Sequence, residues 1–195
     1  MHLEFDQHFL TELQAGSEPA FRSLVESYQN RVYNTCFGFV RHQAEAEDLA
    51  QEVFVEIHQK ISSLKQAESL PAWVYRICVN KSLEYIRYQK RKKRFAFLQP
   101  IFGDKERPDV EPGHWEHPGF QLEEKEKAAV LFTAIESLPE KQRVAFSLHK
   151  LEGLPYQEIA EVMEGSLASI ESLIFRARRN LRKKLMDYYR SQAED

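Results

Sequence analysis

The sequence predicts an all-α protein made of two small helical domains. Along its 195 residues, apolar side chains recur at intervals of three and four rather than in alternation, which is typical of helices with one buried face. The chain is 43% hydrophobic and contains 13 Phe and 8 Tyr, which is ample for well-filled cores. Four of the eight prolines lie within residues 97–120, a composition that predicts a linker between domains at 1–96 and 121–195.

Charge is unevenly distributed along the chain, although the net charge is only −3. Basic residues gather at 87–94 and 176–184, whereas 45–56 and 104–126 are predominantly acidic. A basic patch, rather than the total charge, is the electrostatic footprint of a nucleic-acid-binding protein. The negative total therefore does not exclude nucleic acid as a partner.

The sequence carries no sign of export or of membrane insertion. The N-terminal residues lack the pattern of a secretory signal, and no apolar run approaches the roughly 20 residues that span a bilayer. Cys36 and Cys78 lie within apolar helical patterns, which favours core packing over a disulfide. We therefore expect a cytoplasmic protein.

The first domain is expected to begin with a short amphipathic helix within residues 1–16, followed by a longer one from Glu18 to Val40. A second long helix is expected from Ala44 to Leu64. At about 100° per residue, four of its carboxylates share an arc about 80° wide, and its apolar residues share another arc. These carboxylates form the acidic stripe: Glu45, Asp48, Glu52 and Glu56.

The acidic stripe has three interpretations. It is a solvated helix face, a docking surface for a basic partner, or part of a carboxylate metal site. The metal site would need ligands that converge from another segment, and only His42 and His58 lie near in the sequence.

The third helix of the first domain is expected from Ala72 to about Arg94. Its core side is apolar, and its other side combines an aromatic ring, an amide and a row of arginines. Such a face suits a nucleic acid, with phosphates for the cations, stacking for the ring and base edges for the amide. An ordinary basic helix end is the alternative. The residues of this face are Trp73, Arg76, Asn80, Arg87, Arg91 and Arg94.

The linker contains two histidines, His114 and His117, whose spacing allows a metal pair. Two histidines without further ligands are usually just exposed, so we expect no metal site and no cofactor. Helix is expected to resume near Gln121.

Residues 137–184 predict a helix-turn-helix unit. Ser137 and Glu140 form an S-x-x-E capping box, and Gly153 with Pro155 marks the next break. A short helix should follow from Tyr156 to Met163. In the turn after it, Gly165 is free to take a positive φ, and Ser166 can cap the last helix.

The last helix is expected to place an apolar arc opposite a mostly cationic face. A short helix, a turn and a basic helix form the arrangement that puts a recognition helix into a DNA major groove. A solvated helical pair is the alternative, but turn chemistry, spacing and charge together favour DNA binding. The apolar arc contains Leu167, Ile170, Ile174, Ala177, Leu181 and Leu185. The polar face contains Ala168, Glu171, Ser172, Phe175, Arg176, Arg179 and Lys183.

Several segments together resemble a bacterial extracytoplasmic-function sigma factor of the sigma-70 family. The resemblance covers nearly the whole chain in order, and the combination of segments is specific. The segments are EAEDLAQEVF (45–54), LPAWVYRICVNKSLEYIRYQKRKKR (70–94), SLPEKQRVAFSLHKLEGLPYQEIAEVM (137–163) and FRARRNLRKKL (175–185).

The resemblance implies a non-catalytic subunit that directs core RNA polymerase to promoters. It implies sigma domain 2 at 1–96 and sigma domain 4 at 121–195, with promoter DNA and the polymerase β′ clamp helices and β subunit as partners. An anti-sigma factor is an optional partner, and no small-molecule substrate is implied. The implied β′ contact comprises Asp48, Leu49, Gln51, Glu52, Phe54 and Glu56. The implied −10 reader is the Trp73–Arg94 face. The implied −35 reader comprises Ser166, Ser169, Glu171, Ser172, Phe175, Arg176 and Arg179.

The chain departs from the family pattern in the helix-turn-helix unit. Glu171 and Leu173 stand where Lys or Arg is common, and Gly165 stands where a small apolar residue is usual, with Glu164 in the turn. These departures leave DNA binding in place, but no −35 sequence can be borrowed from relatives.

Two other classes of protein are alternatives. An ordinary helix-turn-helix activator or repressor would account for the C-terminal unit, but it would need neither the acidic stripe nor the Trp/Asn/Arg face. A carboxylate metalloenzyme would account for the acidic stripe, but the sequence supplies neither a convergent ligand set nor a nucleophile.

Overall fold

The structure, a computed structural model, describes residues 6–98 and 122–193. All regular secondary structure in these two ranges is helical, as the apolar spacing predicted. The chain divides into two units, Met1–His114 and Trp115–Asp195. The division falls within the expected linker, whose residues 99–120, including His114 and His117, lie outside the described residues.

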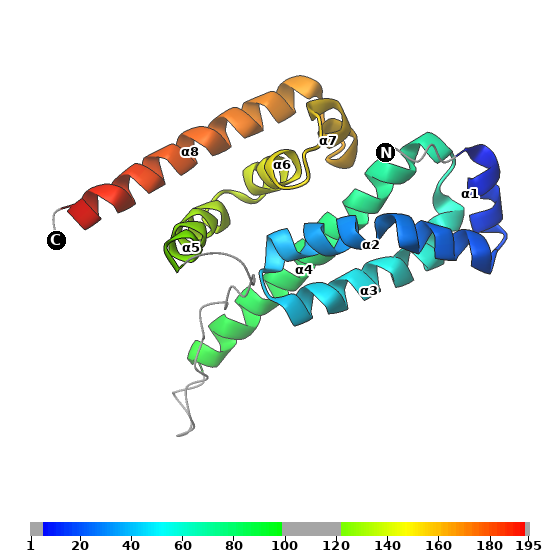
Figure 1. The fold of residues 1–195 in the computed structure, drawn as a ribbon, viewed down its shortest axis with the longest axis horizontal. Coiled ribbons are helices and arrows are strands. Elements are labelled where there is room, and N and C mark those ends of the chain that lie inside the picture. Colours follow the sequence, from blue (N-terminus) through cyan, green and yellow to red (C-terminus); the bar gives the residue numbers. More distant parts are fainter. Residues whose placement is uncertain (1–5, 99–121, 194–195) are drawn as a thin grey trace. The chain divides into compact units, whose positions relative to one another are not determined.

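Within residues 6–98, unit 1 contains four α-helices, with two short 3-10 turns before the last one. Helices α2 and α3 run side by side in Figure 1, and α4 packs against both. The helix predicted from Glu18 to Val40 has those bounds. The elements are α1 (Gln7–Gln14), α2 (Glu18–Val40), α3 (Gln43–Lys60), the turns Ile61–Ser63 and Ala67–Ser69, and α4 (Leu70–Leu98).

Local capping explains where the helices of unit 1 begin. The Asp6 carboxylate accepts a hydrogen bond of 2.8 Å from the Phe9 N–H, and the Ser17 hydroxyl accepts one of 3.4 Å from the Ala20 N–H. Gly16 takes φ +78°, which lets the chain reverse between α1 and α2 without a Cβ clash. Helix α3 ends at Lys60, four residues before the predicted end at Leu64, because the chain tightens there into a 3-10 turn.

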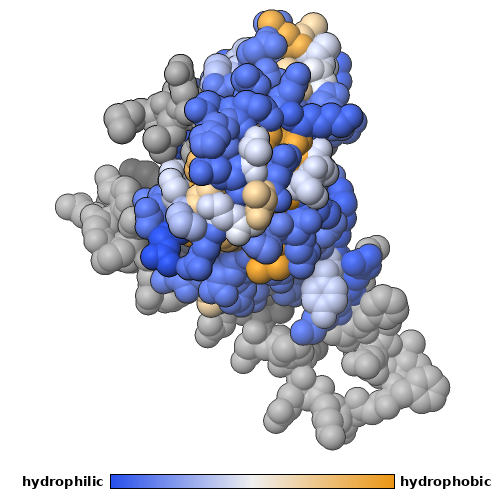
Figure 2. Space-filling view, turned by 90° about the vertical axis from the view of Figure 1, so that its right-hand side faces the viewer, coloured by the Kyte–Doolittle hydropathy of each residue, from blue (hydrophilic) through white to orange (hydrophobic). Residues whose placement is uncertain are grey.

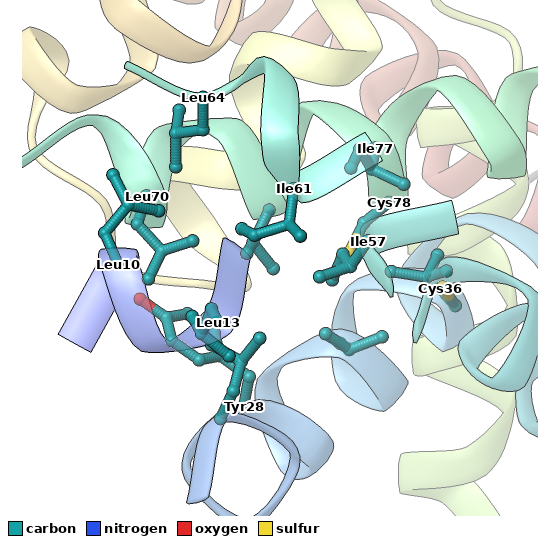
Figure 3. Close-up of a cluster of buried hydrophobic side chains, with 14 of the residues drawn as sticks. Leu10, Leu13, Tyr28, Cys36, Ile57, Ile61, Leu64, Leu70, Ile77 and Cys78 are labelled. Atoms are coloured by element: carbon teal, nitrogen blue, oxygen red, sulfur yellow. The ribbon is translucent and has the colours of Figure 1, made fainter. Parts of the chain in front are cut away.

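The core of unit 1 draws apolar side chains from every helix of the unit (Figure 3). Leu10, Leu24, Ile57 and Leu70 are fully buried, and burying each such side chain contributes about 1.5–3 kcal/mol. Cys36 and Cys78 also lie in this core with 0% exposure and free thiols, as the sequence predicted.

The described part of unit 2, residues 122–193, contains four helices, and α8 contacts each of the other three. In its core, Ala134, Ile135 and Leu138 pack with Ala177 and Leu181 of the last helix. The elements are α5 (Leu122–Glu136), α6 (Glu140–Lys150), α7 (Tyr156–Val162) and α8 (Leu167–Ala193).

A histidine at the end of α6 joins three parts of unit 2. The ring of His149 stacks edge-on against Tyr156 of α7, with centroids 4.8 Å apart. Its Nδ1 lies 3.1 Å from the Leu154 carbonyl oxygen, and its Nε2 lies 3.4 Å from the Arg178 guanidinium of α8. The His149 ring therefore links the segment before α7 to helix α8.

Two predictions about local chemistry in unit 2 are wrong. Ser137 does not cap α6, because its hydroxyl donates to the Ala134 carbonyl at 2.6 Å and Pro139 occupies the N-cap position. Ser137 therefore closes α5 instead. In the turn before α8, the positive φ belongs to Glu164 (+50°) rather than to Gly165.

Gly165 is required for space instead of for backbone conformation. A Cβ built there would lie 2.9 Å from the Ser169 Oγ, closer than side chains approach. The predicted apolar arc of α8 is not buried at its first residue. Leu167 is 44% exposed, whereas Ile170 and Ile174 are buried.

Candidate functional site

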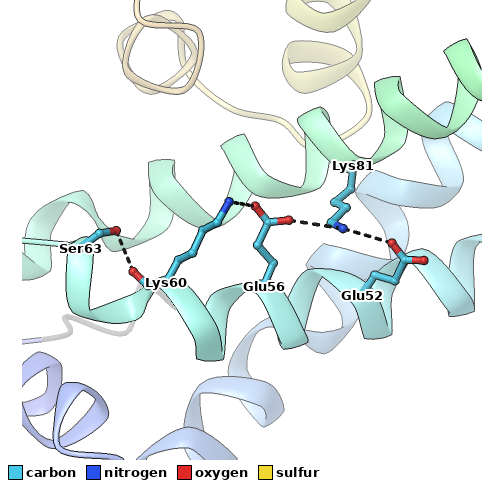
Figure 4. A network of polar contacts seen from close by, with 5 residues as sticks. All are labelled: Glu52, Glu56, Lys60, Ser63 and Lys81. Atoms are coloured by element: carbon cyan, nitrogen blue, oxygen red, sulfur yellow. Dashed lines mark hydrogen bonds and ion pairs between the residues drawn. The ribbon is translucent and has the colours of Figure 1, made fainter.

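The acidic stripe of α3 lies beside α4, where Lys81 reaches across to it (Figure 4). The Lys81 ammonium lies 3.2 Å from Glu52 Oε2 and 3.4 Å from Glu56 Oε2. Glu56 also accepts a hydrogen bond of 2.6 Å from Lys60, one turn further along α3. Two of the four carboxylates of the stripe are therefore partly neutralised within unit 1.

The charges in this network hold one another ionised. Burial would raise the pKa of the Glu56 carboxyl, but hydrogen bonds and attraction from Lys60 and Lys81 outweigh it and lower the pKa below 4.5. Burial would likewise lower the pKa of Lys81, but Glu52 and Glu56 outweigh it and raise that pKa above 10.5. Glu56 and Lys81 are thus both charged at neutral pH.

Glu45, the first carboxylate of the stripe, also meets α4. Burial, followed by a hydrogen bond between its side chain and Tyr85, raises the pKa of Tyr85 to about 12. The Tyr85 hydroxyl in turn accepts a hydrogen bond of 2.7 Å from Gln89. Glu45 is half-buried, whereas Asp48 is exposed.

A shallow groove runs along the outer side of the stripe, with Glu52, Lys81 and an exposed valine among its lining residues. Val55 is 56% exposed, and sequence analysis did not single it out. Val55 lies seven residues after Asp48 and therefore on nearly the same side of the helix, and this spacing is the sequence signal that could have identified it. The groove is lined by Asp48, Gln51, Glu52, Val55, Glu56, Gln59, Lys60 and Lys81.

Two residues expected in the protein-docking surface belong to the core instead. Leu49 is 4% exposed and lies in the core of unit 1, and Phe54 is partly buried against the same core. Leu49 therefore presents almost none of its surface to a partner in the free protein, and its role in the docking surface stays a prediction. The side chains expected in that surface that remain exposed are Asp48, Gln51 and Glu52, with Glu56 half-buried.

The Trp/Asn/Arg face of α4 is only partly exposed. Asn80, Arg87 and Arg91 are exposed and Arg76 is half-buried. Trp73 is partly buried against the core of unit 1, so much of its ring is used in packing. The side chain of Arg94 lies outside the described part of the chain.

The polar face of α8 is exposed as the sequence predicted. Glu171, Arg176 and Arg179 are exposed, Ser172 is half-buried, and Phe175 is 68% exposed. A fully apolar ring with that exposure has much of its surface in water.

The two serines at the start of α8 bond to each other. The Ser166 hydroxyl accepts a hydrogen bond of 3.3 Å from the Ser169 N–H, which makes it the predicted cap of the helix. The Ser169 hydroxyl donates to the Ser166 carbonyl at 2.7 Å. Both serines are exposed, and both are engaged in holding the turn.

Unit 2 also carries an apolar groove that sequence analysis missed. Leu131 and Met186, which are 39% and 48% exposed, line it together with Phe146, and Arg178, Arg182 and Arg190 add cations. Its residues come from α5, α6 and α8, so no single stretch of sequence carries the signal.

Most residues on the face shown in Figure 2 are hydrophilic, with small apolar spots between them. No helix within 6–98 or 122–193 is long and apolar enough to cross a membrane. The same ranges contain no group of three or more His, Cys, Asp or Glu side chains placed to hold a metal ion.

Comparison with known families accounts for both units. The profile described as Sigma-70 region 2 matches residues 24–92, and the profile described as Sigma-70, region 4 matches residues 128–181. The chain belongs to the sigma-70 family. The first match contains the acidic stripe and most of the α4 face, and the second contains most of the helix-turn-helix unit.

Curated relatives resemble this sigma factor over almost its whole length. The RNA polymerase sigma-H factor of Pseudomonas aeruginosa is 30% identical over 194 residues, covering 96% of this chain and 97% of the relative. The ECF RNA polymerase sigma-E factor of Escherichia coli K12 is 30% identical over 185 residues, covering 95% and 96%.

Solved structures show the same fold. CnrH in complex with the cytosolic domain of CnrY has a TM-score of 0.67 at 20% identity, covering 94% of this chain and 97% of that one. The sigma factor RpoE of Bartonella quintana, solved with the anti-sigma factor NepR, has a TM-score of 0.58 at 20% identity, covering 85% and 96%.

Proposed function

We propose that this sigma factor binds core RNA polymerase and directs it to promoters through three surfaces. The acidic groove of α3 is the polymerase contact, the exposed face of α4 reads the −10 element, and the polar face of α8 reads the −35 element. We place its domains at 1–96 and 121–195, and we propose that it acts in the cytoplasm without catalysis of its own. The observation that carries the proposal is the order of the two family matches along the chain, each containing its expected surfaces.

The acidic groove suits a basic helical partner. Asp48, Gln51 and Glu52 are exposed on one side of α3, and Val55 lies between them and the end of the helix. An apolar centre with charged surroundings is the usual anatomy of a protein–protein contact. A simple helix-turn-helix regulator would have no use for this surface.

The two DNA surfaces combine cations with groups that can read bases. On α4, Arg87 and Arg91 can meet phosphates, and the exposed Asn80 can bond to a base edge. On α8, Arg176 and Arg179 supply cations beside Glu171 and Phe175. The capped, exposed N-terminal turn of α8 is the part of a recognition helix that meets base edges.

An anti-sigma protein is a further proposed partner. Two solved structures of the same fold were determined with such a protein or with a cytosolic domain bound. A partner of this class would act by covering one or more of the three surfaces.

The test is run-off transcription with core polymerase on a promoter library. We expect the wild-type chain to select promoters. Asp48→Lys with Gln51→Lys should abolish both transcription and co-purification with core polymerase, because reversed charge replaces attraction with repulsion.

Glu26→Lys with Gln29→Lys is the matched control, since both residues are exposed on α2 with the same spacing and the same change of charge. Circular dichroism should show the same helix content in all three proteins. A wild-type chain that supports no selective transcription would contradict the proposed function.

The alternative of an ordinary helix-turn-helix regulator makes the opposite prediction. Such a protein would bind a specific duplex without polymerase, and the Asp48→Lys, Gln51→Lys variant would bind it as well as wild type does.

A further inference from the structure

The bridge from Lys81 treats its two carboxylate partners differently. The Glu56 side chain is 22% exposed and is held by both Lys60 and Lys81, whereas the Glu52 side chain is 59% exposed. Exposed ion pairs contribute little because water competes with the partner, whereas less exposed pairs with several partners are more persistent. Lys81 lies slightly closer to Glu52 (3.2 Å) than to Glu56 (3.4 Å), but the Glu56 pair is better shielded from water and has a second partner in Lys60. Glu56 is therefore the carboxylate that keeps Lys81 in place, and Glu52 is the one that can leave it.

Lys81 also changes the charge of the groove. Its lining residues include three carboxylates (Asp48, Glu52 and Glu56) and two ammonium groups (Lys60 and Lys81), which give a local charge of −1. Removing Lys81 would leave −2. A cation that approaches Glu52 from a partner must therefore share that carboxylate with an ammonium group 3.2 Å away.

We propose that Lys81 is an affinity-setting residue, which competes with a cation of core RNA polymerase for the Glu52 carboxylate. The inference rests on the proposed polymerase contact at the acidic groove. In the free protein Lys81 occupies Glu52. On binding, Glu52 turns to the partner's cation and Lys81 remains with Glu56. The bridge thus weakens binding to polymerase while it stabilises the packing of α3 against α4.

The experiment measures the affinity of the full chain for core polymerase by fluorescence anisotropy, at low and at physiological salt. We expect Lys81→Met to bind about three- to tenfold more tightly than wild type, with a larger gain at low salt because charge attraction is screened by ions. Glu52→Gln should bind more weakly than wild type. In the Glu52→Gln background, Lys81→Met should bring no gain, because the carboxylate for which it competes is gone.

Three further variants separate this role from a structural one. Lys81→Arg keeps the cation and should bind like wild type. Lys81→Gln removes the charge but can still donate to Glu56, so it should reproduce the gain even if Lys81→Met does not fold. Lys90→Met changes an exposed lysine on the same helix and should alter nothing.

Equal or weaker binding by both Lys81→Met and Lys81→Gln would overturn the inference, and so would a gain that persists without Glu52. Either result would leave the proposed function standing as long as wild type binds core polymerase. A wild-type chain that does not bind would instead overturn the proposed function itself.

Discussion

Glu56 joins the proposed polymerase contact to the rest of unit 1. It lies one turn from Glu52 on α3, yet it is half-buried and meets Lys60 at 2.6 Å and Lys81 at 3.4 Å. The same acidic stripe therefore contains a carboxylate that stabilises unit 1 and carboxylates that remain exposed. Spacing along a helix cannot distinguish these two roles.

Glu56→Gln should lower the free energy of unfolding of unit 1 by about 1 kcal/mol at neutral pH, because Lys60 and Lys81 lose their shared partner. The lowered pKa of Glu56 makes this contribution present above pH 4.5 and lost as pH falls through the folded-state pKa. At high pH it should be lost again as pH rises through the raised pKa of Lys81.

Thermal unfolding of wild type and Glu56→Gln measures this difference in stability. The measurements should cover roughly pH 3 to 8, so that they pass through the carboxyl pKa. The melting temperatures should converge at the acid end. A constant gap between the two proteins at every pH would contradict the assignment.

We expect Glu171 and Arg176 to give the proposed −35 surface its base selectivity. A glutamate accepts a hydrogen bond from cytosine N4, and a carboxylate near phosphates is costly unless it finds such a donor. Glu171→Ala should relax base preference at one −35 position with little loss of affinity. Selection of −35 sequences by holoenzyme carrying the variant is the measurement, and an unchanged selected sequence would show that Glu171 reads no base.

Arg176→Ala should weaken promoter binding. If Arg176 bonds to guanine, the variant should also relax one position by about 1–3 kcal/mol. If it bonds to phosphate, the loss should be similar for all sequences. The two outcomes separate in the same selection experiment.

At the scale of elements, the turn between α7 and α8 sets the geometry of the recognition helix. Glu164 takes the left-handed conformation, while Gly165 leaves room for the Ser169 hydroxyl, which donates to the Ser166 carbonyl. The turn is therefore held by a local serine pair and a missing Cβ.

The effect of Gly165→Ala on the stability of unit 2 should depend on whether residue 169 is serine. In the wild-type background the new Cβ displaces the Ser169 hydroxyl and breaks its hydrogen bond, at a cost of about 1 kcal/mol. In a Ser169→Ala background the nearest remaining atom is Ile170 Cδ1 at 3.7 Å, an ordinary contact. There the substitution should stabilise by about 0.4–1 kcal/mol, because alanine restricts the unfolded chain.

Chemical denaturation of wild type, the two single variants and the double variant measures the coupling free energy between Gly165→Ala and Ser169→Ala. We expect a coupling of about 1 kcal/mol. Additive effects would show that the hydroxyl and the missing Cβ are unrelated.

At the scale of the whole molecule, the two proposed DNA-binding surfaces are divided between two units. The faces of α4 and α8 lie in units 1 and 2, and the net charge of the chain is −3. Two weak contacts strengthen each other only when their spacing is held, and core polymerase would hold it.

The free protein should therefore bind promoter duplex weakly, with a Kd of about 10⁻⁶ M or above at physiological salt. Adding core polymerase should tighten binding to the nanomolar range on promoter but not on a scrambled duplex. Gel-shift titration with and without core polymerase is the measurement. Selective nanomolar binding by the isolated chain would contradict this account.

Some side chains have more than one possible contact, and the local sequence pattern does not say which contact forms. Ser137 precedes Glu140 at the capping-box spacing, but its hydroxyl turned back to the Ala134 carbonyl. Leu49 directly follows Asp48 in the segment that matches the family motif, yet it lies in the core. A local pattern states which bonds are possible, and packing selects among them.

The sequence by itself determined the helical class, the bounds of α2, the cap at Ser166 and the polar face of α8, because each depends on contacts within a few residues. Only the tertiary structure decided the roles within the acidic stripe, the burial of Trp73 and the apolar groove of unit 2. Those features join helices far apart in the chain. Lys81 and Glu52 are 29 residues apart, and no periodicity within one helix specifies which side chain of another helix will face it.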